Sequence, residues 1–186
     1  MLIRSVRESD AQTLLSIYAP YVTGTAVTFE WETPTEEEFR RRIKGISERY
    51  PYLVLENQGR IQGYAYASSF KGRAAYDWAV ETTIYLNPSS RGKGYGKALY
   101  EALEKELARR HFLNAYACIS FLEDADPYLT QASPRFHAKM GYTRCGTFHR
   151  CGYKFGRWYD MIWMEKSLGE HDKNPLPILW QGETEE

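Results

Sequence analysis

The stretch that decides the fold is TIYLNPSSRGKGYGKALY, residues Thr83 to Tyr100: an apolar, β-branched run, a turn, a basic glycine-rich loop and a helical pattern. Glycines at positions 92, 94 and 96 remove side chains where the helix begins. A helix N-terminus exposes unpaired backbone N–H groups and the positive end of the helix dipole. Arg91, Lys93 and Lys97 add positive charge there, so the stretch predicts a site for a phosphate or pyrophosphate.

Two well-known phosphate loops do not match this stretch. The dinucleotide pattern G-x-G-x-x-G needs glycine where Lys97 stands, and the Walker pattern needs Ser or Thr where Ala98 stands. What remains is Arg91-x-x-Gly94-x-Gly96 between a strand and a helix. An ordinary tight turn would also explain these glycines, so other parts of the chain must decide.

Composition limits the class of protein. The chain has 186 residues, 43% hydrophobic and 26% charged, which predicts one soluble globular domain with a sizeable core. Lys plus Arg and Asp plus Glu number 24 each, so no overall basic field attracts nucleic acid or a membrane surface. Three cysteines, with no apolar leader and no long apolar run, predict a reduced cytoplasmic protein without disulfides. We expect no metal.

The hydrophobic pattern predicts the element order β-α-α-β-β-β-α-β-α-β-β. Three local signals mark boundaries: Pro20 is expected to end the first helix, Thr35 and Glu38 have the spacing of a capping box, and Ser133 is expected to cap the fourth helix. The predicted helices cover about 10–19, 35–48, 95–109 and 133–140, and the strands 2–6, 52–56, 61–69, 78–87, 113–120, 142–148 and 157–166.

The strand before the glycine loop carries a single charge, Glu81. Alternation places Glu81, Thr83 and Tyr85 on one face of that strand. A glutamate on a strand face is usually solvated, so the pattern alone does not make Glu81 catalytic. The following helix and the strand 113–120 complete a parallel βαβ unit, which places the glycine loop at the carboxyl end of the first strand.

Three other segments stand out. The aromatic loop 23–31 contains Phe29 and Trp31, which either line a cleft or pack under the loop. The loop 121–130 is acidic, with Asp124 and Asp126, and the polar residues 170–186 are expected to form a surface tail after a domain of residues 1–169.

Several ordered motifs carry a family resemblance: Phe29-Glu30, Arg73 to Tyr76, the loop Arg91 to Gly96, Ser133 to His137, and Gly152 to Asp160. With this element order, residues 2–167 resemble the GCN5-related N-acetyltransferases (GNAT), and within them the phosphinothricin acetyltransferase branch. The resemblance implies an α/β fold, with a mixed central sheet of six to seven strands and helices on both faces. It also implies direct acetyl transfer from acetyl-CoA to the amine of a small amino-acid-like substrate such as phosphinothricin or methionine sulfoximine.

The resemblance further implies roles for individual residues. Glu81 stands at the position of the general base and would act through water. His137 stands where many acetyltransferases have a tyrosine that protonates the leaving thiolate, although it could instead orient the cofactor or pack on the helix. The expected cofactor contacts are Ile84, Tyr85, Leu86, Arg91, Gly92, Lys93, Gly94, Tyr95, Gly96, Lys97, Thr130 and Ser133. The expected substrate contacts are Phe29, Arg73, Tyr76 and Lys154, and Lys154 could equally be a surface charge in a turn.

Two departures leave the substrate open. Thr130 stands where many relatives carry asparagine, and the loop 121–130 is longer than in the typical enzyme, so that it could close over the substrate or favour a cationic one. Besides the small-amine enzyme, two alternatives are a protein or peptide N-acetyltransferase and a non-catalytic acyl-CoA-binding domain. The resemblance also implies a homodimer that pairs through the C-terminal strands.

Overall fold

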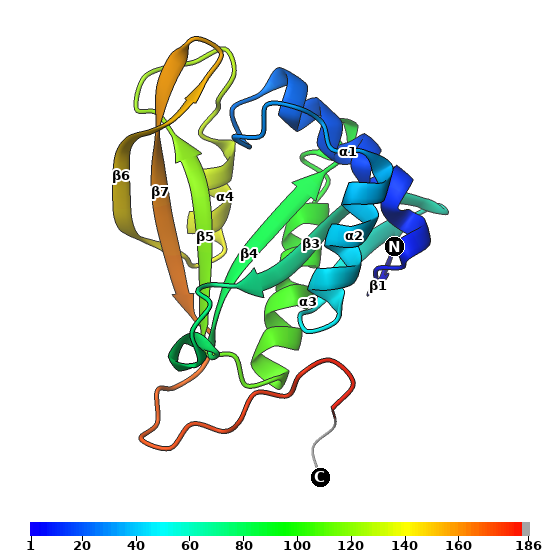
Figure 1. Cartoon of the computed structure of the whole chain (residues 1–186), viewed down its shortest axis with the longest axis vertical. Helices are drawn as coiled ribbons and strands as arrows, with labels where there is room; N and C mark the ends of the chain where they lie inside the picture. Colours follow the sequence, from blue (N-terminus) through cyan, green and yellow to red (C-terminus); the bar gives the residue numbers. More distant parts are fainter. Residues whose placement is uncertain (184–186) are drawn as a thin grey trace.

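A seven-stranded mixed sheet forms the centre of the molecule in the computed structural model, which describes residues 1–183; the expected tail residues 184–186 lie outside this range. The strand order is β1-β2-β3-β4-β5-β7-β6 (Figure 1). This confirms the predicted α/β fold. The strands are β1 (Leu2–Ser5), β2 (Tyr52–Asn57), β3 (Arg60–Ser69), β4 (Ala79–Leu86), β5 (Asn114–Phe121), β6 (Thr143–Lys154) and β7 (Arg157–Ser167).

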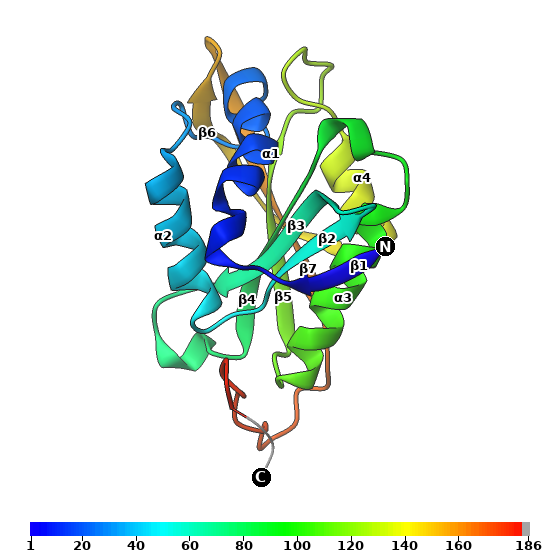
Figure 2. The ribbon, with the colours of Figure 1, turned by 90° about the vertical axis from the view of Figure 1, so that its right-hand side faces the viewer.

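Helices cover both faces of the sheet, as Figure 2 shows. One face carries α1 (Ala11–Gly24) and α2 (Glu36–Ser47), whose apolar sides pack on the tyrosines of β2 and β3. The other carries α3 (Tyr95–Arg109) and α4 (Ala132–Lys139), and the apolar stripe of α3 packs on alanines of β3 and β5. Among the described residues, no helix has both the length and the apolar character needed to span a membrane.

The parallel strands β4 and β5 stay together only briefly. Their register runs from Ala79 opposite Asn114 to Glu81 opposite Tyr116, although both strands continue for about five residues more. Beyond Glu81 they diverge, and Figure 1 shows the resulting wedge, open at their carboxyl ends. The fold therefore has a gap in the middle of the sheet, directly below the glycine loop that follows β4.

Some predicted boundaries are wrong. Pro20 lies inside α1, which continues to Gly24. Proline removes a hydrogen bond to the carbonyl four residues earlier, but Ser16 is exposed and water can serve its carbonyl. Burial of Tyr21 and Val22 in the next turn favours continuing the helix. In α4 the N-cap is Gln131, not Ser133, which lies in the first turn.

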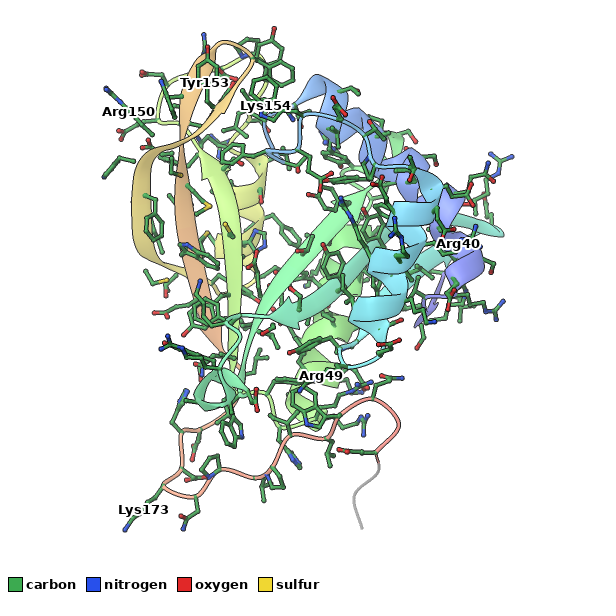
Figure 3. All side chains as sticks on the ribbon, in the orientation of Figure 1. Arg40, Arg49, Arg150, Tyr153, Lys154 and Lys173 are labelled. Carbon is green, nitrogen blue, oxygen red and sulfur yellow. The ribbon has the colours of Figure 1, made fainter. Side chains whose placement is uncertain are left out.

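The segment after β7 packs back on the domain. Ile178 is buried in the main core, and the Trp78 indole N–H donates to the Leu176 carbonyl at 2.8 Å. The Trp180 ring lies beside Phe112 at 6.0 Å and beneath the Arg49 guanidinium at 3.9 Å. Figure 3 shows Arg49 above this segment. Residues 176–181 thus contribute to the core at the end of the sheet opposite the wedge.

Candidate active site

The glycine loop presents the N-terminus of α3 to solvent. Gly92 and Gly94 have φ values of +77° and +79°, a conformation that glycine adopts without strain. Gly94 is the N-cap, and since it has no side chain, no side-chain cap covers the first amides of the helix. Gly96 has a different role, because a Cβ there would lie 3.2 Å from the Leu86 side chain and 3.4 Å from the Phe136 ring. The loop is therefore both exposed and closely packed on β4.

The basic side chains of the loop surround these amides. Arg91, Lys93 and Lys97 are exposed. The Arg91 guanidinium lies over the Tyr21 ring at 5.3 Å, and the Tyr21 hydroxyl donates to the Leu86 carbonyl at 2.6 Å, which ties the loop to α1 and β4. The Tyr95 hydroxyl accepts a hydrogen bond from Asn57 at 2.9 Å. This geometry suits a phosphate group held by backbone N–H donors with cations around it.

A cavity of about 290 Å³ occupies the wedge between β4 and β5. Six residues expected at the site line it: Phe29, Glu81, Ile84, Tyr85, Ser133 and His137. Glu81 is the only carboxylate and, among the described residues, no lysine or arginine lines this cavity. The wedge thus brings the expected base, the strand edge and the expected acid to one cavity.

Two opposing effects act on the pKa of the Glu81 carboxyl group. Burial in the cavity wall raises its pKa above the ordinary 4.5, and the positive charge of Lys71 partly opposes this effect. Burial and the negative charge of Glu81 also raise the pKa of the neighbouring Cys118 thiol, to about 12. A carboxylate with a raised pKa is a stronger proton acceptor, whereas Cys118 stays a neutral thiol.

His137 is buried, and both of its ring nitrogens contact protein groups. Nδ1 lies 2.9 Å from the Ser133 carbonyl oxygen, and Nε2 lies 3.0 Å from the Tyr100 hydroxyl. Burial lowers the pKa of His137, and the Ser133 carbonyl opposes this by accepting from the imidazole N–H. The ring is thus fixed in the cavity wall, and whether each nitrogen carries a proton depends on the Tyr100 hydroxyl and the Ser133 carbonyl.

The remaining expected substrate residues do not line the cavity. Arg73 and Tyr76 lie on the exposed connection between β3 and β4. Lys154 is buried, and its ammonium donates to the carbonyls of Val22 and Thr28 at 2.8 Å each. Figure 3 shows Lys154 where the β6–β7 hairpin approaches the end of α1. It is therefore no surface charge, and it holds the loop that carries Phe29.

Phe29 depends on the hairpin in a second way. A Cβ at Gly152 would overlap the Phe29 ring, so only glycine leaves room for this part of the cavity wall. The expected cofactor residue Thr130 is exposed in the loop before α4 and follows Leu129, which lines the cavity.

The acidic loop is tied down. The Asp126 carboxylate is fully buried, accepts from the Tyr128 backbone N–H at 2.7 Å and pairs with Arg157. Tyr128 stacks on Phe155 with ring centroids 4.1 Å apart. The charge of Asp126 is thus neutralised within the protein, and of the loop's carboxylates Glu123 and Asp124 are the exposed ones.

Sequence reasoning missed several cavity residues, among them Tyr18, Thr28, Tyr66, Thr82, Cys118 and Met161. Tyr18 follows the apolar spacing of α1, which predicts a core residue, and Cys118 and Met161 sit on strands whose alternation gives no sign of the wedge. Within residues 1–183, no group of three or more His, Cys, Asp or Glu side chains could hold a metal ion.

Comparisons with known proteins agree with this geometry. Residues 3–163 match the family model described as an acetyltransferase (GNAT) domain. Phosphinothricin N-acetyltransferases of Streptomyces coelicolor and Streptomyces viridochromogenes are 37% and 33% identical; the alignments cover 89% and 95% of this chain and 95% and 92% of those proteins.

A solved structure adds the cofactor of a relative. The phosphinothricin acetyltransferase of Sinorhizobium meliloti, crystallised in complex with acetyl-CoA, superposes with a TM-score of 0.85 and 34% identity, covering 94% of this chain and 92% of that one. The chain therefore belongs to the GNAT acetyltransferase family, in its phosphinothricin N-acetyltransferase-like branch.

Proposed function

We propose that this enzyme transfers the acetyl group of acetyl-CoA directly to the primary amine of a small amino-acid-like substrate, of the phosphinothricin or methionine sulfoximine type. The observation that carries the proposal is the wedge: one cavity joins Glu81, the free edge of β4 and His137, below a glycine loop that suits a pyrophosphate. The relatives that match along nearly the whole chain are named for this chemistry.

The chain offers one continuous surface to acetyl-CoA, which would supply the acetyl group. The backbone amides of Arg91 to Gly96 would hold the pyrophosphate, with Lys93 and Lys97 beside it. Because β5 does not pair with β4 beyond Glu81, the edge of Ile84 to Leu86 that faces the wedge is available to the pantetheine arm as an added strand. Thr130 and Ser133 would contact the cofactor from the opposite wall.

Glu81 would act as the general base. Acyl transfer needs a neutral amine, and a carboxylate with a raised pKa accepts a proton more readily than an exposed one. We place a water molecule between the Glu81 carboxylate and the substrate amine, as the family resemblance implies for this base. His137, which also lines the cavity, would return a proton to the departing thiolate.

Substrate contacts would come from two sides. Phe29 forms a wall of the cavity, and Lys154 supports that wall from behind without reaching the substrate. Arg73 and Tyr76 would meet the carboxylate or phosphinyl oxygens outside the cavity, where Tyr76 packs on Phe70 at 5.9 Å. Arginine suits such oxygens because its planar fork donates paired hydrogen bonds. A homodimer in the cytoplasm, with its three free cysteines reduced, completes the proposal.

The size of the cavity favours a small acceptor. A protein or peptide N-acetyltransferase needs an open groove for an extended chain, whereas the loops 25–31 and 122–130 meet over this cavity through the bond from the Ala26 N–H to the Tyr128 carbonyl at 2.9 Å. A non-catalytic acyl-CoA-binding domain has no need of a half-buried carboxylate beside the acyl site.

The test measures thiol release from acetyl-CoA across a panel of amino acids, amino-acid analogues and simple amines. We expect turnover with an amino-acid-like amine and a loss of about 10²- to 10⁴-fold in kcat for Glu81→Gln, with acetyl-CoA binding by calorimetry unchanged. Glu48→Gln, an exposed glutamate at the end of α2, is the matched control. Wild-type turnover by Glu81→Gln, or no uptake of acetyl-CoA by the folded protein, would refute the proposal.

A further inference from the structure

Four short contacts link two backbone carbonyls through the floor of the cavity. The Thr82 hydroxyl donates to the Tyr116 carbonyl at 3.0 Å and lies 2.6 Å from the Tyr100 hydroxyl. The Tyr100 hydroxyl lies 3.0 Å from His137 Nε2, and Nδ1 lies 2.9 Å from the Ser133 carbonyl. All four distances are normal for hydrogen bonds. We call this row of groups the Thr82–His137 chain.

Counting protons shows what this chain lacks. Both ends are carbonyls, which only accept, so four contacts need four protons. Thr82 and Tyr100 bring one proton each, and a neutral imidazole brings one, so the neutral chain is one proton short. An oxygen–oxygen or oxygen–nitrogen contact without a proton between the atoms sets lone pair against lone pair, which is costly in a buried place.

A second proton on His137 completes the chain. Nδ1–H then donates to Ser133, Nε2–H donates to Tyr100, Tyr100 donates to Thr82, and Thr82 donates to Tyr116. We propose that Thr82 and Tyr100 are positioning residues that let buried His137 hold a second proton, which the enzyme returns to the leaving thiolate. Transfer of this proton to the thiolate rests on the proposed function. Binding of the second proton by His137 does not.

Transfer of the proton balances within the groups present. The imidazolium gives up one N–H proton, the coenzyme A thiolate becomes a thiol, and His137 is left as neutral imidazole. The Ser133 hydroxyl, 3.4 Å from Nδ1 and also lining the cavity, can donate to that nitrogen once it is bare. Loss of the proton again leaves the chain one short, which favours reprotonation before the next turnover.

Other polar groups near His137 do not supply the missing proton. The Tyr142 hydroxyl also interacts with the hydroxyls of Tyr100 and Thr82, and its ring packs on Tyr100 and His137 at 5.7 and 5.4 Å. It brings one proton for the contact that it adds, so the chain itself stays one proton short. Behind these rings, Glu104 pairs with Lys166 at 2.7 Å. Glu81 and Cys118 line the same cavity as His137.

The experiment is a titration of His137 by NMR in protein labelled with ¹⁵N-histidine, assigned by the signal that His137→Gln removes from the four histidines. In Thr82→Val, Tyr100 donates to Nε2 and neutral His137 is satisfied, but the imidazolium leaves the Tyr100 proton without the acceptor that Thr82 provides. We therefore expect its pKa to fall by about one to two units. Thr82→Ser keeps the hydroxyl and should restore the wild-type value.

The matched control is Thr143→Val, which makes the same substitution at an exposed position of β6 and should leave the His137 pKa unchanged. The alkaline limb of the kcat profile should move to lower pH with Thr82→Val and stay in place with Thr143→Val. An unchanged or raised His137 pKa in Thr82→Val overturns the inference. If the pKa falls as expected but no amine is acetylated, the chain is confirmed and the proposed function is the part that fails.

Discussion

Two opposing effects set the pKa of Glu81, and the one that comes from Lys71 can be removed by substitution. Burial raises its pKa and the charge of Lys71 lowers it. Lys71→Met should therefore raise the Glu81 pKa further, so that the carboxylate needed as a base forms only at higher pH. The acid limb of kcat/KM should move up by a few tenths of a unit to about one unit. Lys105→Met, at an exposed position on α3, is the control. A limb that stays in place or moves down contradicts this account.

How far the sequence predicts single residues depends on whether their partners are local. The face of β4 that carries Glu81 follows from strand alternation, which has a strict period of two. Lys71 and Tyr100 give no such signal, because each acts on a residue that only the tertiary fold brings near. Lys154 shows the same limit: its two carbonyl partners are 126 and 132 residues away in the chain.

At the scale of elements, the glycines before α3 divide into two kinds, and substitutions separate them. Gly94→Ala meets no atom within 4 Å but forces alanine to a φ of +79°, which costs about 1–2 kcal/mol and shifts the amides. We expect roughly tenfold weaker acetyl-CoA binding by calorimetry and a Tm lower by about 2–8 °C, the shift that this strain corresponds to in a chain of this length. Gly96→Val crowds Leu86 and Phe136 and should lower the free energy of unfolding by about 1–3 kcal/mol.

The control for both glycine variants is Gly45→Ala in α2, where an added Cβ meets nothing within 4 Å. Alanine in a helix is about 0.5–1 kcal/mol more favourable than glycine, so this variant should be slightly more stable and bind acetyl-CoA normally. If Gly94→Ala binds acetyl-CoA as well as Gly45→Ala does, the loop is not the pyrophosphate site.

Lys154 joins the β6–β7 hairpin to the end of α1, and its loss should loosen that junction. Lys154→Met leaves the Val22 and Thr28 carbonyls without their donor, so we expect unfolding to become easier by about 1–3 kcal/mol and KM for the amine to rise as Phe29 moves. Burial lowers the pKa of Lys154 below 10.5, so the unfolded chain binds more protons between the two pKa values.

The Lys154 ammonium should therefore make the free energy of unfolding of the wild type rise with pH in the alkaline window just below 10.5. In Lys154→Met this contribution to the rise should be absent. Urea unfolding at pH 7 and across this window measures both effects. Lys173→Met, in the exposed segment after β7, is the control. An equally stable Lys154→Met variant with normal KM would show that the junction does not hold the wall.

Elements with local signals are predicted well, and those decided by packing are not. The capping box of Thr35 and Glu38 forms as predicted, because both bonds lie within four residues. Pro20 is the opposite case: its local preference is to end a helix, but burial of the next turn decides. The divergence of β4 and β5 has no signal in the alternation of either strand, because it depends on how the two strands pack in the whole sheet.

At the scale of the whole molecule, residues 176–181 close the end of the sheet away from the wedge. Trp180→Ala removes a ring that packs on Phe112 and carries the Arg49 guanidinium, and should lower stability by about 1–3 kcal/mol. For a chain of this length each kcal/mol corresponds to a Tm change of roughly 2–4 °C. Turnover below the unfolding temperature should be unchanged, since the cavity is at the other end of the sheet.

The control is Leu176→Ala, at an exposed side chain of the same segment. An unchanged Tm for Trp180→Ala would mean that this packing adds nothing to the stability of the fold.

The other large-scale feature is an exposed aromatic surface on the sheet edge formed by β6, β7 and the loop before α2. Trp31, Phe148 and Trp158 are 68%, 54% and 55% exposed, and Tyr153 lies between the two tryptophans with centroids 6.4 and 5.1 Å away. Exposed apolar groups gathered on one surface are typical of an interface. If a two-fold axis pairs this surface with itself, light scattering should give about twice the 21.7 kDa of the chain.

A double variant, Phe148→Lys with Trp158→Lys, should convert that dimer to a monomer, because lysines placed face to face repel each other and bury no apolar area. Leu176→Lys changes an equally exposed apolar side chain elsewhere and should leave the mass at the dimer value. A wild-type monomer at all concentrations would leave this surface without a partner. A dimer that survives the double lysine variant would instead place the contact on another face, and the edge strand β6 would then be protected only by its own bulges between Arg144 and Gly146 and between Phe148 and Gly152.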